Sequence, residues 1–560
     1  MNETTIVSQN IKYFLCFTGL CVIILITQYL QNVYATELLS DANGHYVTTL
    51  LAHDYIKAGF PGNPVSFAVD YFIHYPSIRI GNNPPTFYVL SSLWALITTD
   101  SIHAALVLSA ILGAVYCIFT LILSSRVLGM GAGVIIAFAV ALLPLFRDVA
   151  GSFLIDIPIG IFCLAAILSY ARFLNTQSAR SAVLFSLLAA AALMIKLSAL
   201  FLAVMVPMAI LISGKFYLLR NKYFWLPVLI IGVLILPWYL FTFENLTEGA
   251  KKQWTILFPL QALTEYLSIL ASNITLPGIA LLGAGVIERI RFIRSNPNDA
   301  AADLWSVIIA LLAAVVFFQA LMPTNILDRY LITALAPAMI LVWRGARVLG
   351  EYISDVFGRR GLLSENLRNR IPHLVCAAII LIIMGPALHI KPATGNRMAE
   401  VARKVSQTLP ASNPVVMIAS DGVRESSFIA QLAQVDRARP SLFAIRASRV
   451  LGKEEGFMNI DYKPKFNSPE EVLAELERLS VTMVVLDRAK QAQEWRHNRD
   501  IAWLADHRPE LWRPVGSIQN PGNDGALSLL VLKSSEAKMV DFPLLRREFR
   551  PNSGNIGTED

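Results

Sequence analysis

The sequence predicts a polytopic α-helical membrane protein that ends in a small extracytoplasmic α/β domain. Its 560 residues are 55% hydrophobic and only 16% charged, whereas about a quarter of the residues in a typical soluble protein are charged. Apolar runs of about 18 residues or more, long enough for a membrane-spanning helix, recur along residues 1–389. After residue 390, short strand-like runs alternate with helical segments. We therefore expect a transmembrane domain over 1–389 and an α/β domain over 390–560.

Positive charge is gathered in short connectors between the apolar runs, so the net charge of +7 does not indicate nucleic-acid binding. Loops rich in lysine and arginine are typical of the cytoplasmic side of a membrane protein. Residues 344–370, for example, hold six arginines against three acidic residues. The other basic connectors contain Arg126, Arg172 with Arg180, Lys215 with Arg220 and Lys222, and Arg289 with Arg291 and Arg294. We place all of them, and the N-terminus, in the cytoplasm.

This sidedness predicts about eleven spans. The first, residues 13–33, is expected to be an uncleaved span rather than a signal peptide. All five cysteines lie in apolar segments, so no structural disulfide is expected. The predicted spans cover residues 13–33, 103–123, 129–146, 153–171, 181–195, 197–213, 224–243, 270–287, 303–322, 330–348 and 371–389.

Lys196 stands in the middle of the apolar stretch 181–213, between two cytoplasmic connectors. At about 1.5 Å per residue this stretch is too long for one upright crossing, so it must cross twice and turn near Lys196. The same reasoning puts Arg147, Asp148 and Asp156 in an outer turn, and Asp328 and Arg329 in another. Residues 34–102 become the first outer loop, which carries Asp41. These charges are predicted to converge on one face.

Asp41 opens a predicted amphipathic helix in which Tyr46, Val47 and Leu50 share one face, expected to lie on the membrane surface. The alternative is that Asp41 is only an N-cap. His45 follows at i+4 spacing. Asp41 and Asn43 could also ligate a hard cation, which leaves a divalent metal possible although nothing in the sequence completes its shell.

Further candidate polar groups lie before a Pro-Pro step and within or next to the apolar spans. Pro84 and Pro85 start a short helix, with Arg79 and the Asn82–Asn83 pair just before it as donors to phosphate or hydroxyl groups. For the two asparagines, an ordinary turn is the alternative. A carboxylate as deep in apolar sequence as Asp156 is functional by default, although purely structural pairing with Lys196 or Arg147 is the alternative. Lys196 in turn could merely snorkel, and Arg329 could anchor at the interface or bind a phosphate.

In order along residues 10–345, these motifs resemble those of the GT-C membrane glycosyltransferases, in particular protein O-mannosyltransferases and bacterial aminoarabinose transferases. The matching residues are Asp41, Pro84–Pro85, Asp156 with Pro158, Lys196, and Arg329–Tyr330 with Pro337. Two positions depart from the family pattern. Ala42 stands where many relatives have a second carboxylate, and Asn83 stands where many have a lysine.

The resemblance implies a polyprenyl-phosphate sugar donor, presented from the outer leaflet of the bacterial inner membrane, and an envelope acceptor such as a protein, lipid A or a glycan. Asp41 would be the catalytic base of an inverting transfer, and Asp156 would orient substrates. Lys196, Arg329 and Arg79 would bind the donor phosphate. Possible substrate contacts are His45, Tyr46, Asn83, Asp328 and Tyr330. A lipid or solute transporter is the alternative function, although transporters usually show repeated halves and none is evident here.

The C-terminal part contains four strand-like runs, "PVVMIAS", "SLFAI", "VTMVVLD" and "LSLLVL". Between them, Ser468 and Glu471 form a predicted capping box, with Pro469 in the first helical turn. Neither a nucleotide-binding glycine loop nor metal-ligand spacing is recognisable in this part of the sequence.

Overall fold

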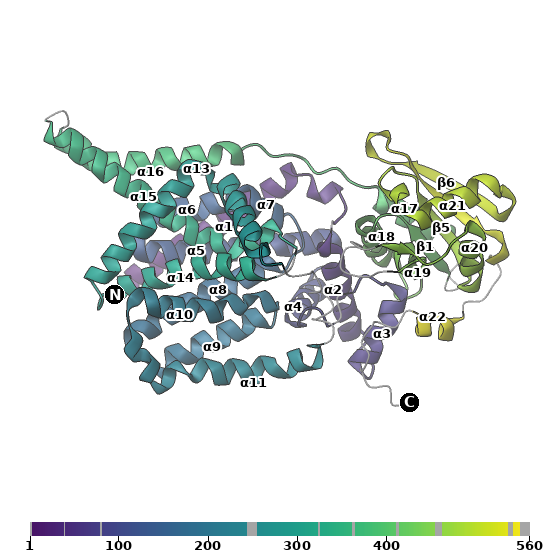
Figure 1. Cartoon of the computed structure of the whole chain (residues 1–560), viewed down its shortest axis with the longest axis horizontal. Helices are drawn as coiled ribbons and strands as arrows, with labels where there is room; N and C mark the ends of the chain where they lie inside the picture. The colour runs from purple at the N-terminus through teal and green to yellow at the C-terminus, as the bar shows by residue number, and fades with distance from the viewer. Residues whose placement is uncertain are drawn as a thin grey trace.

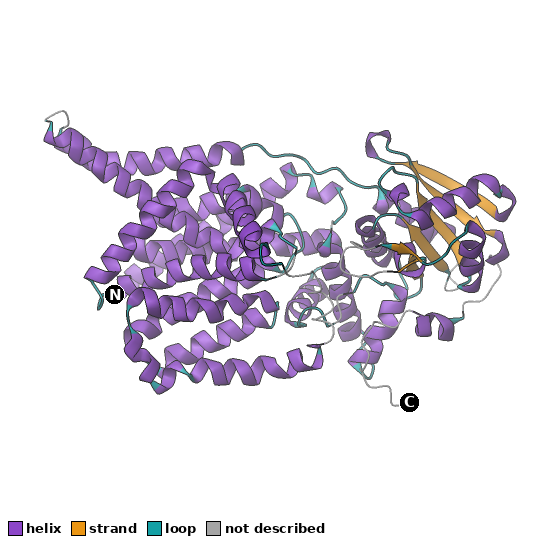
Figure 2. Ribbon diagram, in the orientation of Figure 1, coloured by secondary structure: helices purple, strands orange, loops and turns teal. Residues whose placement is uncertain are grey.

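A bundle of long helices and an α/β unit at one of its ends make up the protein (Figure 1). Figure 2 shows the strands confined to that end. The computed structural model describes residues 3–38, 40–78, 81–243, 255–322, 325–360, 364–409, 414–453, 462–535 and 541–548.

Eight helical segments among the described residues are long and apolar enough to cross a membrane. They are built on α1 (Glu3–Leu30), α5 (Ile102–Leu128), α8 (Asp156–Thr176), α11 (Leu226–Phe241), α13 (Phe258–Ser295), α14 (Ala300–Leu321), α15 (Ile332–Arg359) and α16 (Glu365–Ala387). A ninth candidate is the pair α6 (Met130–Leu142) and α7 (Pro144–Ala150), bent by 66°. The predicted multi-pass membrane class is confirmed.

The other predicted crossings correspond to two helices that are shorter than a standard span, α9 (Ala179–Leu193) and α10 (Phe201–Ser213). They are separated by a break at Lys196 and the 3-10 turn η2 (Leu197–Leu200). The predicted turn near Lys196 is therefore present. The helix after Pro84–Pro85, α4 (Thr86–Ile97), is also short, as predicted.

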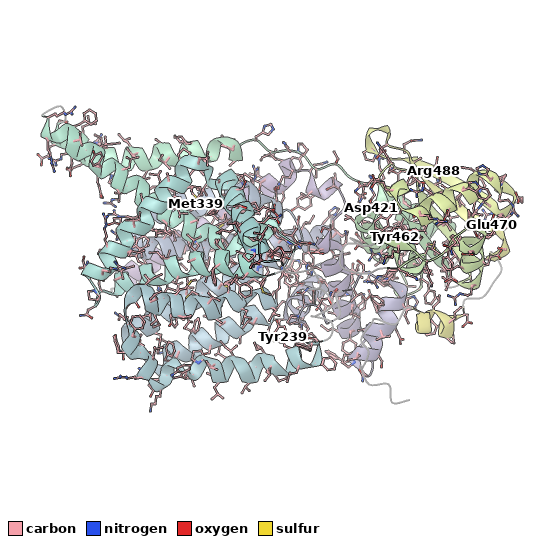
Figure 3. All side chains as sticks on the ribbon, viewed as in Figure 1. Tyr239, Met339, Asp421, Tyr462, Glu470 and Arg488 are labelled. Atoms are coloured by element: carbon pink, nitrogen blue, oxygen red, sulfur yellow. The ribbon has the colours of Figure 1, made fainter. Side chains whose placement is uncertain are left out.

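Helices α13 and α15 cross at a point where both lack a side chain. A Cβ atom on Gly285 would overlap the carbonyl oxygen of Leu341, and one on Gly345 would overlap that of Leu281. Membrane helices associate by such close backbone contact because lipid offers no hydrophobic drive between them. This crossing brings α15, which carries part of the candidate site at its start, into the centre of the bundle. Met339, labelled in Figure 3, lies fully buried on α15.

The α/β unit holds a five-stranded sheet in the order β2-β1-β5-β7-β6. Strands β2, β1 and β5 are parallel, and β7 and β6 continue the sheet antiparallel. The strands are β1 (Val415–Ala419), β2 (Phe443–Arg446), β5 (Val481–Asp487), β6 (Trp512–Gln519) and β7 (Ala526–Leu532), with a two-stranded ladder of β3 (Gly452–Lys453) and β4 (Lys463–Pro464). The helices are α17 (Met398–Thr408), α18 (Gly422–Val435), α19 (Ala447–Val450), α20 (Pro469–Arg478), α21 (Arg496–His507) and α22 (Phe542–Glu548).

All four predicted strand-like runs form strands of this sheet. Strand β6 was not predicted, because its Pro514 and Gly516 are unusual in a strand. In the structure, the pairing of β6 with β7 is irregular between these two residues. Strand β6 also lies at the edge of the sheet, where proline is tolerated. Ser468 caps α20 by accepting a hydrogen bond from Glu471 N at 3.3 Å. The boundary at residue 389 stays a prediction, but it falls between the end of α16 and the start of α17.

Two helices of the first predicted outer loop lie between the bundle and the sheet, α2 (Asp41–Lys57) and α3 (Pro64–His74) (Figure 1). The helix predicted from Asp41 is present, but it does not lie free on a membrane surface. Helix α18 packs on α2, and β2 packs against α3. Every residue from Ala42 to Leu50 is buried, and both α4 and α18 pack against α2.

Candidate functional site

The four predicted charged residues lie where helices begin or break. Asp41 is the first residue of α2, and Asp156 is the first residue of α8. Lys196 stands in extended conformation directly before η2. Arg329 belongs to η5 (Asp328–Leu331), the 3-10 turn that leads into α15. Carboxylates at helix N-termini are favoured by the positive end of the helix dipole.

These residues meet in one chain of alternating charges. Lys196 Nζ lies 3.0 Å from Asp156 Oδ1, and Arg329 Nε lies 3.9 Å from Asp156 Oδ2. The Arg329 guanidinium also donates a hydrogen bond to Asp41. The four side chains are only 7–19% exposed, with Asp156 the least and Lys196 the most exposed. Charges buried to this extent need partners, and here each cation has a carboxylate beside it.

The ring of Tyr330 lies beside both cations. Lys196 Nζ is 4.5 Å from the ring centroid, and the Arg329 guanidinium carbon is 5.8 Å from it. An aromatic face at this distance attracts a cation. The ring therefore helps to keep two positive charges close together at one end of the bundle.

A small pocket, with room for about one water molecule, lies next to this chain of charges. Its walls combine apolar side chains with hydrogen-bonding groups. Ser198, Gln319 and Thr333 were not predicted from the sequence, because single polar residues in or beside apolar spans are common. The lining residues are Asp156, Ile159, Ser198, Phe201, Gln319, Arg329, Tyr330, Ile332 and Thr333.

Buried polar contacts hold the backbone on both sides of the site. Tyr116 of α5 donates a hydrogen bond to the Ile332 carbonyl at 2.7 Å and so holds the start of α15. Its ring fits because residue 160 is glycine: a Cβ there would lie 2.6 Å from a ring carbon of Tyr116. On the other side, Tyr239 of α11 (Figure 3) donates to the Leu193 carbonyl at 2.6 Å, at the end of α9 just before Lys196.

The alternative pairing of Asp156 with Arg147 is not what the structure shows. Arg147 is buried and donates to the Ala387 carbonyl, whereas Asp156 pairs with Lys196. Nor does Asp41 occupy the cap position of α2, which belongs to Ser40. Asp148 accepts a hydrogen bond from Gln31 Nε2 at 2.8 Å, outside the chain of charges.

Three of the residues predicted as substrate contacts form hydrogen bonds within the protein. His45 Nδ1 lies 2.9 Å from the Tyr88 hydroxyl, and the Tyr46 hydroxyl donates to the Asp100 carbonyl at 2.6 Å. Asp328 is exposed and accepts from the backbone nitrogen of Arg329 at 2.7 Å. Asn83 is half-buried next to Pro84. Arg79 lies outside the described residues.

The possible metal site stays a hypothesis. Across the described ranges, no three His, Cys, Asp or Glu side chains gather in a group that could hold a metal ion. Asn43 is fully buried two residues after Asp41, and its side-chain oxygen has no hydrogen-bond partner within the described part of the chain.

Comparison with known proteins agrees with this geometry. Residues 82–241 match the family model described as dolichyl-phosphate-mannose-protein mannosyltransferase. That match includes Pro84–Pro85, Asp156 and Lys196, and stops before Arg329. No curated protein sequence matches the chain.

Solved structures cover far more of the molecule. The chain is similar to ArnT from Cupriavidus metallidurans bound to undecaprenyl phosphate, with 12% identity and a TM-score of 0.55 over 94% of this chain and 99% of that one. The apo state of the same protein gives a TM-score of 0.56 at 12% identity, over 95% and 100% of the two chains. The fold is the GT-C fold.

A third solved structure with the same fold is the Archaeoglobus fulgidus oligosaccharyltransferase tethered with an acceptor peptide. It is 14% identical, with a TM-score of 0.51 over 91% of this chain and 74% of that one. The predicted resemblance to GT-C membrane glycosyltransferases is thus confirmed by the family match and the shared fold together.

Proposed function

We propose that this GT-C protein transfers a sugar from a polyprenyl-phosphate donor to an acceptor in the cell envelope, with inversion at the anomeric carbon. The observation that carries the proposal is the buried chain Asp41–Arg329–Asp156–Lys196 beside a partly polar pocket. The matching family is named for dolichyl-phosphate-mannose, and the similar ArnT structure is bound to undecaprenyl phosphate, which is also a polyprenyl-type phosphate. We place the reaction at the face of the membrane where the α/β unit lies.

The proposed chemistry uses one base, Asp41, and two cations, Lys196 and Arg329. The acceptor hydroxyl gives its proton to the Asp41 carboxylate as its oxygen attacks the anomeric carbon. The bond from that carbon to the phosphate oxygen breaks, and the sugar leaves its lipid. The lipid phosphate then carries one more negative charge than it did in the donor. Lys196 and Arg329 are placed to stabilise that developing charge in a site with little water.

The resting ion pairs have a role in this scheme. Before a donor binds, Arg329 pairs with the Asp41 carboxylate and compensates its buried negative charge. A bound phosphate competes for the same guanidinium, whose fork suits phosphate as well as carboxylate. Its binding releases Asp41 to accept a proton. Asp156, the least exposed of the four, keeps both cations oriented throughout.

The test is sugar transfer by the purified full chain. We would supply a panel of radiolabelled polyprenyl-phosphate sugars, with envelope extract as acceptor, and compare wild type with Asp41→Asn. Asp355→Asn is the matched control, because Asp355 forms an exposed ion pair with Arg368 in the hairpin of α15 and α16. Loss of a general base lowers the rate by roughly 10²- to 10⁴-fold.

Each outcome decides between named alternatives. Transfer by wild type and Asp355→Asn that is lost in Asp41→Asn supports the proposal and identifies the donor. Equal transfer by Asp41→Asn moves the base to Asp156. Folded wild-type protein that transfers from no donor overturns the proposal, and a transport assay in vesicles then becomes the next experiment.

A further inference from the structure

Helix α2 begins with Asp41, and its opposite end is bound by the α/β unit. Asp54 lies in the last turn of α2, and Arg439 of the α/β unit grips it with two hydrogen bonds, Nε to Oδ2 at 2.6 Å and Nη2 to Oδ1 at 3.0 Å. The same guanidinium reaches Asp100, just before α5, at 2.8 Å. Its remaining nitrogen donates to the Ala433 carbonyl at the end of α18. Arg439 thus joins three separate elements.

The contact between Arg439 and Asp54 is a buried ion pair rather than a surface ion pair. The Arg439 side chain is 9% exposed and that of Asp54 is 13% exposed. The Asp54 carboxylate also accepts a hydrogen bond from Tyr71 of α3 at 2.9 Å. Burial acts to raise the pKa of Asp54, but hydrogen bonds from His53 and Arg439 outweigh it and hold the pKa below its usual value. Bidentate arginine–carboxylate pairs fix geometry as well as charge.

A second contact with the α/β unit lies just before Asp41 in the sequence. Glu37 accepts hydrogen bonds from the backbone nitrogens of Asn396 and Ala399, at 2.7 and 3.2 Å, where α17 begins. Between Glu37 and Asp54, which make these two contacts, Ser40 has φ +52°, which is unfavourable for a residue with a Cβ atom. A strained turn of this kind persists only where surrounding contacts hold it.

The body of α2 is enclosed as well. Helix α18 packs along it, and the Ser77 and Ser426 hydroxyls, 2.6 Å apart, join the loop after α3 to α18. His74 Nδ1 lies 3.0 Å from the Leu442 carbonyl, just before β2. Because an α-helix is stiff over this length, a restraint on Asp54 limits where Asp41 can lie.

We propose that Arg439 is a positioning residue for Asp41, and that the α/β unit sets the place of the catalytic carboxylate opposite Arg329. This inference rests on the proposed function. The α/β unit then acts on the rate of the reaction through α2, and its own residues need not touch the sugar. Displacement of a reacting group by about 1 Å can lower a rate on the order of 100-fold.

The experiment separates turnover from donor binding in the full chain. Arg439→Met and Arg439→Lys are compared with wild type, and active sites are counted by binding of radiolabelled undecaprenyl phosphate. The matched control is Arg488→Met. Arg488 (Figure 3) also forms a two-bonded pair, with Asp506, but on the exposed surface of the α/β unit.

We expect Arg439→Met to lower kcat per binding site by roughly 10- to 100-fold with unchanged affinity for undecaprenyl phosphate. Arg439→Lys, which restores the charge and one hydrogen bond, should recover part of the loss. Arg488→Met should match wild type. A residue that only stabilised the fold would lower the number of binding sites and leave kcat per site unchanged.

If Arg439→Met does not fold, Asp54→Asn removes the same ionic contact with a much smaller change and is measured in the same way. A kcat per site within twofold of wild type in the folded variants would overturn the inference. Wild-type protein without transfer from any donor would instead contradict the proposed function, so the two failures are distinguishable.

Discussion

Arg329 donates a hydrogen bond to Asp41 across 288 positions of sequence, while its Nε lies 3.9 Å from Asp156. One guanidinium therefore faces two carboxylates that begin two different helices. A lysine carries all three of its donors on a single nitrogen, so it lacks the planar fork with which a guanidinium can face two separate carboxylates in a fixed geometry.

Replacing Arg329 by lysine should therefore separate charge from geometry. We expect Arg329→Lys to lower kcat by about 10²- to 10³-fold, the range seen when a donor to developing negative charge is removed. Arg347→Lys is the control, since Arg347 pairs with Glu351 one turn along α15 in a half-exposed contact. Sugar transfer measured under saturating donor compares the two. Near-normal turnover by Arg329→Lys would mean that only the charge matters.

The close crossing of α13 and α15 predicts that neighbouring glycines differ in their tolerance to alanine. Gly285→Ala should destabilise the protein by about 2 kcal/mol or more, because the added methyl group meets backbone of α15 that cannot rotate away. Gly283, two residues earlier on α13, has no atom within 4 Å of an added Cβ. Gly283→Ala should be neutral or slightly stabilising. The test is to measure the Tm of both variants by thermal unfolding in detergent. Equal Tm values would disprove the close crossing.

His497 gives the α/β unit a predictable response to acid. Its ring is buried, with Nδ1 2.8 Å from the Tyr462 hydroxyl (Figure 3), and burial lowers its pKa from 6.5 to about 3. Between these values only the unfolded chain takes up the proton. The free energy of unfolding should therefore fall as the pH drops from about 6.5 towards 3.

Melting curves of the full chain between pH 7.5 and pH 4.5 test this response. His497→Gln should weaken the dependence of Tm on pH, even if its Tm is lower throughout. His507→Gln, at the exposed end of the same helix, should keep the wild-type slope. An unchanged slope in His497→Gln would assign the acid response to other groups.

Much of the fold could be predicted because it follows from local patterns. Charge in the connectors and the length of apolar runs predicted the turn at Lys196, and counting crossings placed Asp41, Asp156 and Arg329 on one side with it. The buried strands were recognisable from uninterrupted β-branched and apolar residues. Strand β6 was missed because Pro514 and Gly516 argue locally against a strand, whereas an edge position accepts them.

What could not be predicted depends on contacts between distant segments. The pattern of α2 predicted an apolar face on the membrane surface, but α2 packs against α4 and α18 instead. Nothing local in the sequence links Asp54 to Arg439, so their contact could not be predicted. Gln319 and Thr333 gain significance only because α14 and α15 place them on the wall of the same pocket.

The contact between Asp54 and Arg439 spans 385 positions of sequence, and this has a consequence for biosynthesis. Ribosomes add about 5–20 residues per second, so Arg439 is synthesised roughly 20–80 s after Asp54. During that time α18, which packs against α2, has not been made either. Under the proposed role of Arg439, Asp41 is held in place only after the α/β unit has been made and has folded. A nascent chain that lacks the α/β unit would thus hold the helices of the bundle without the contacts proposed to position Asp41.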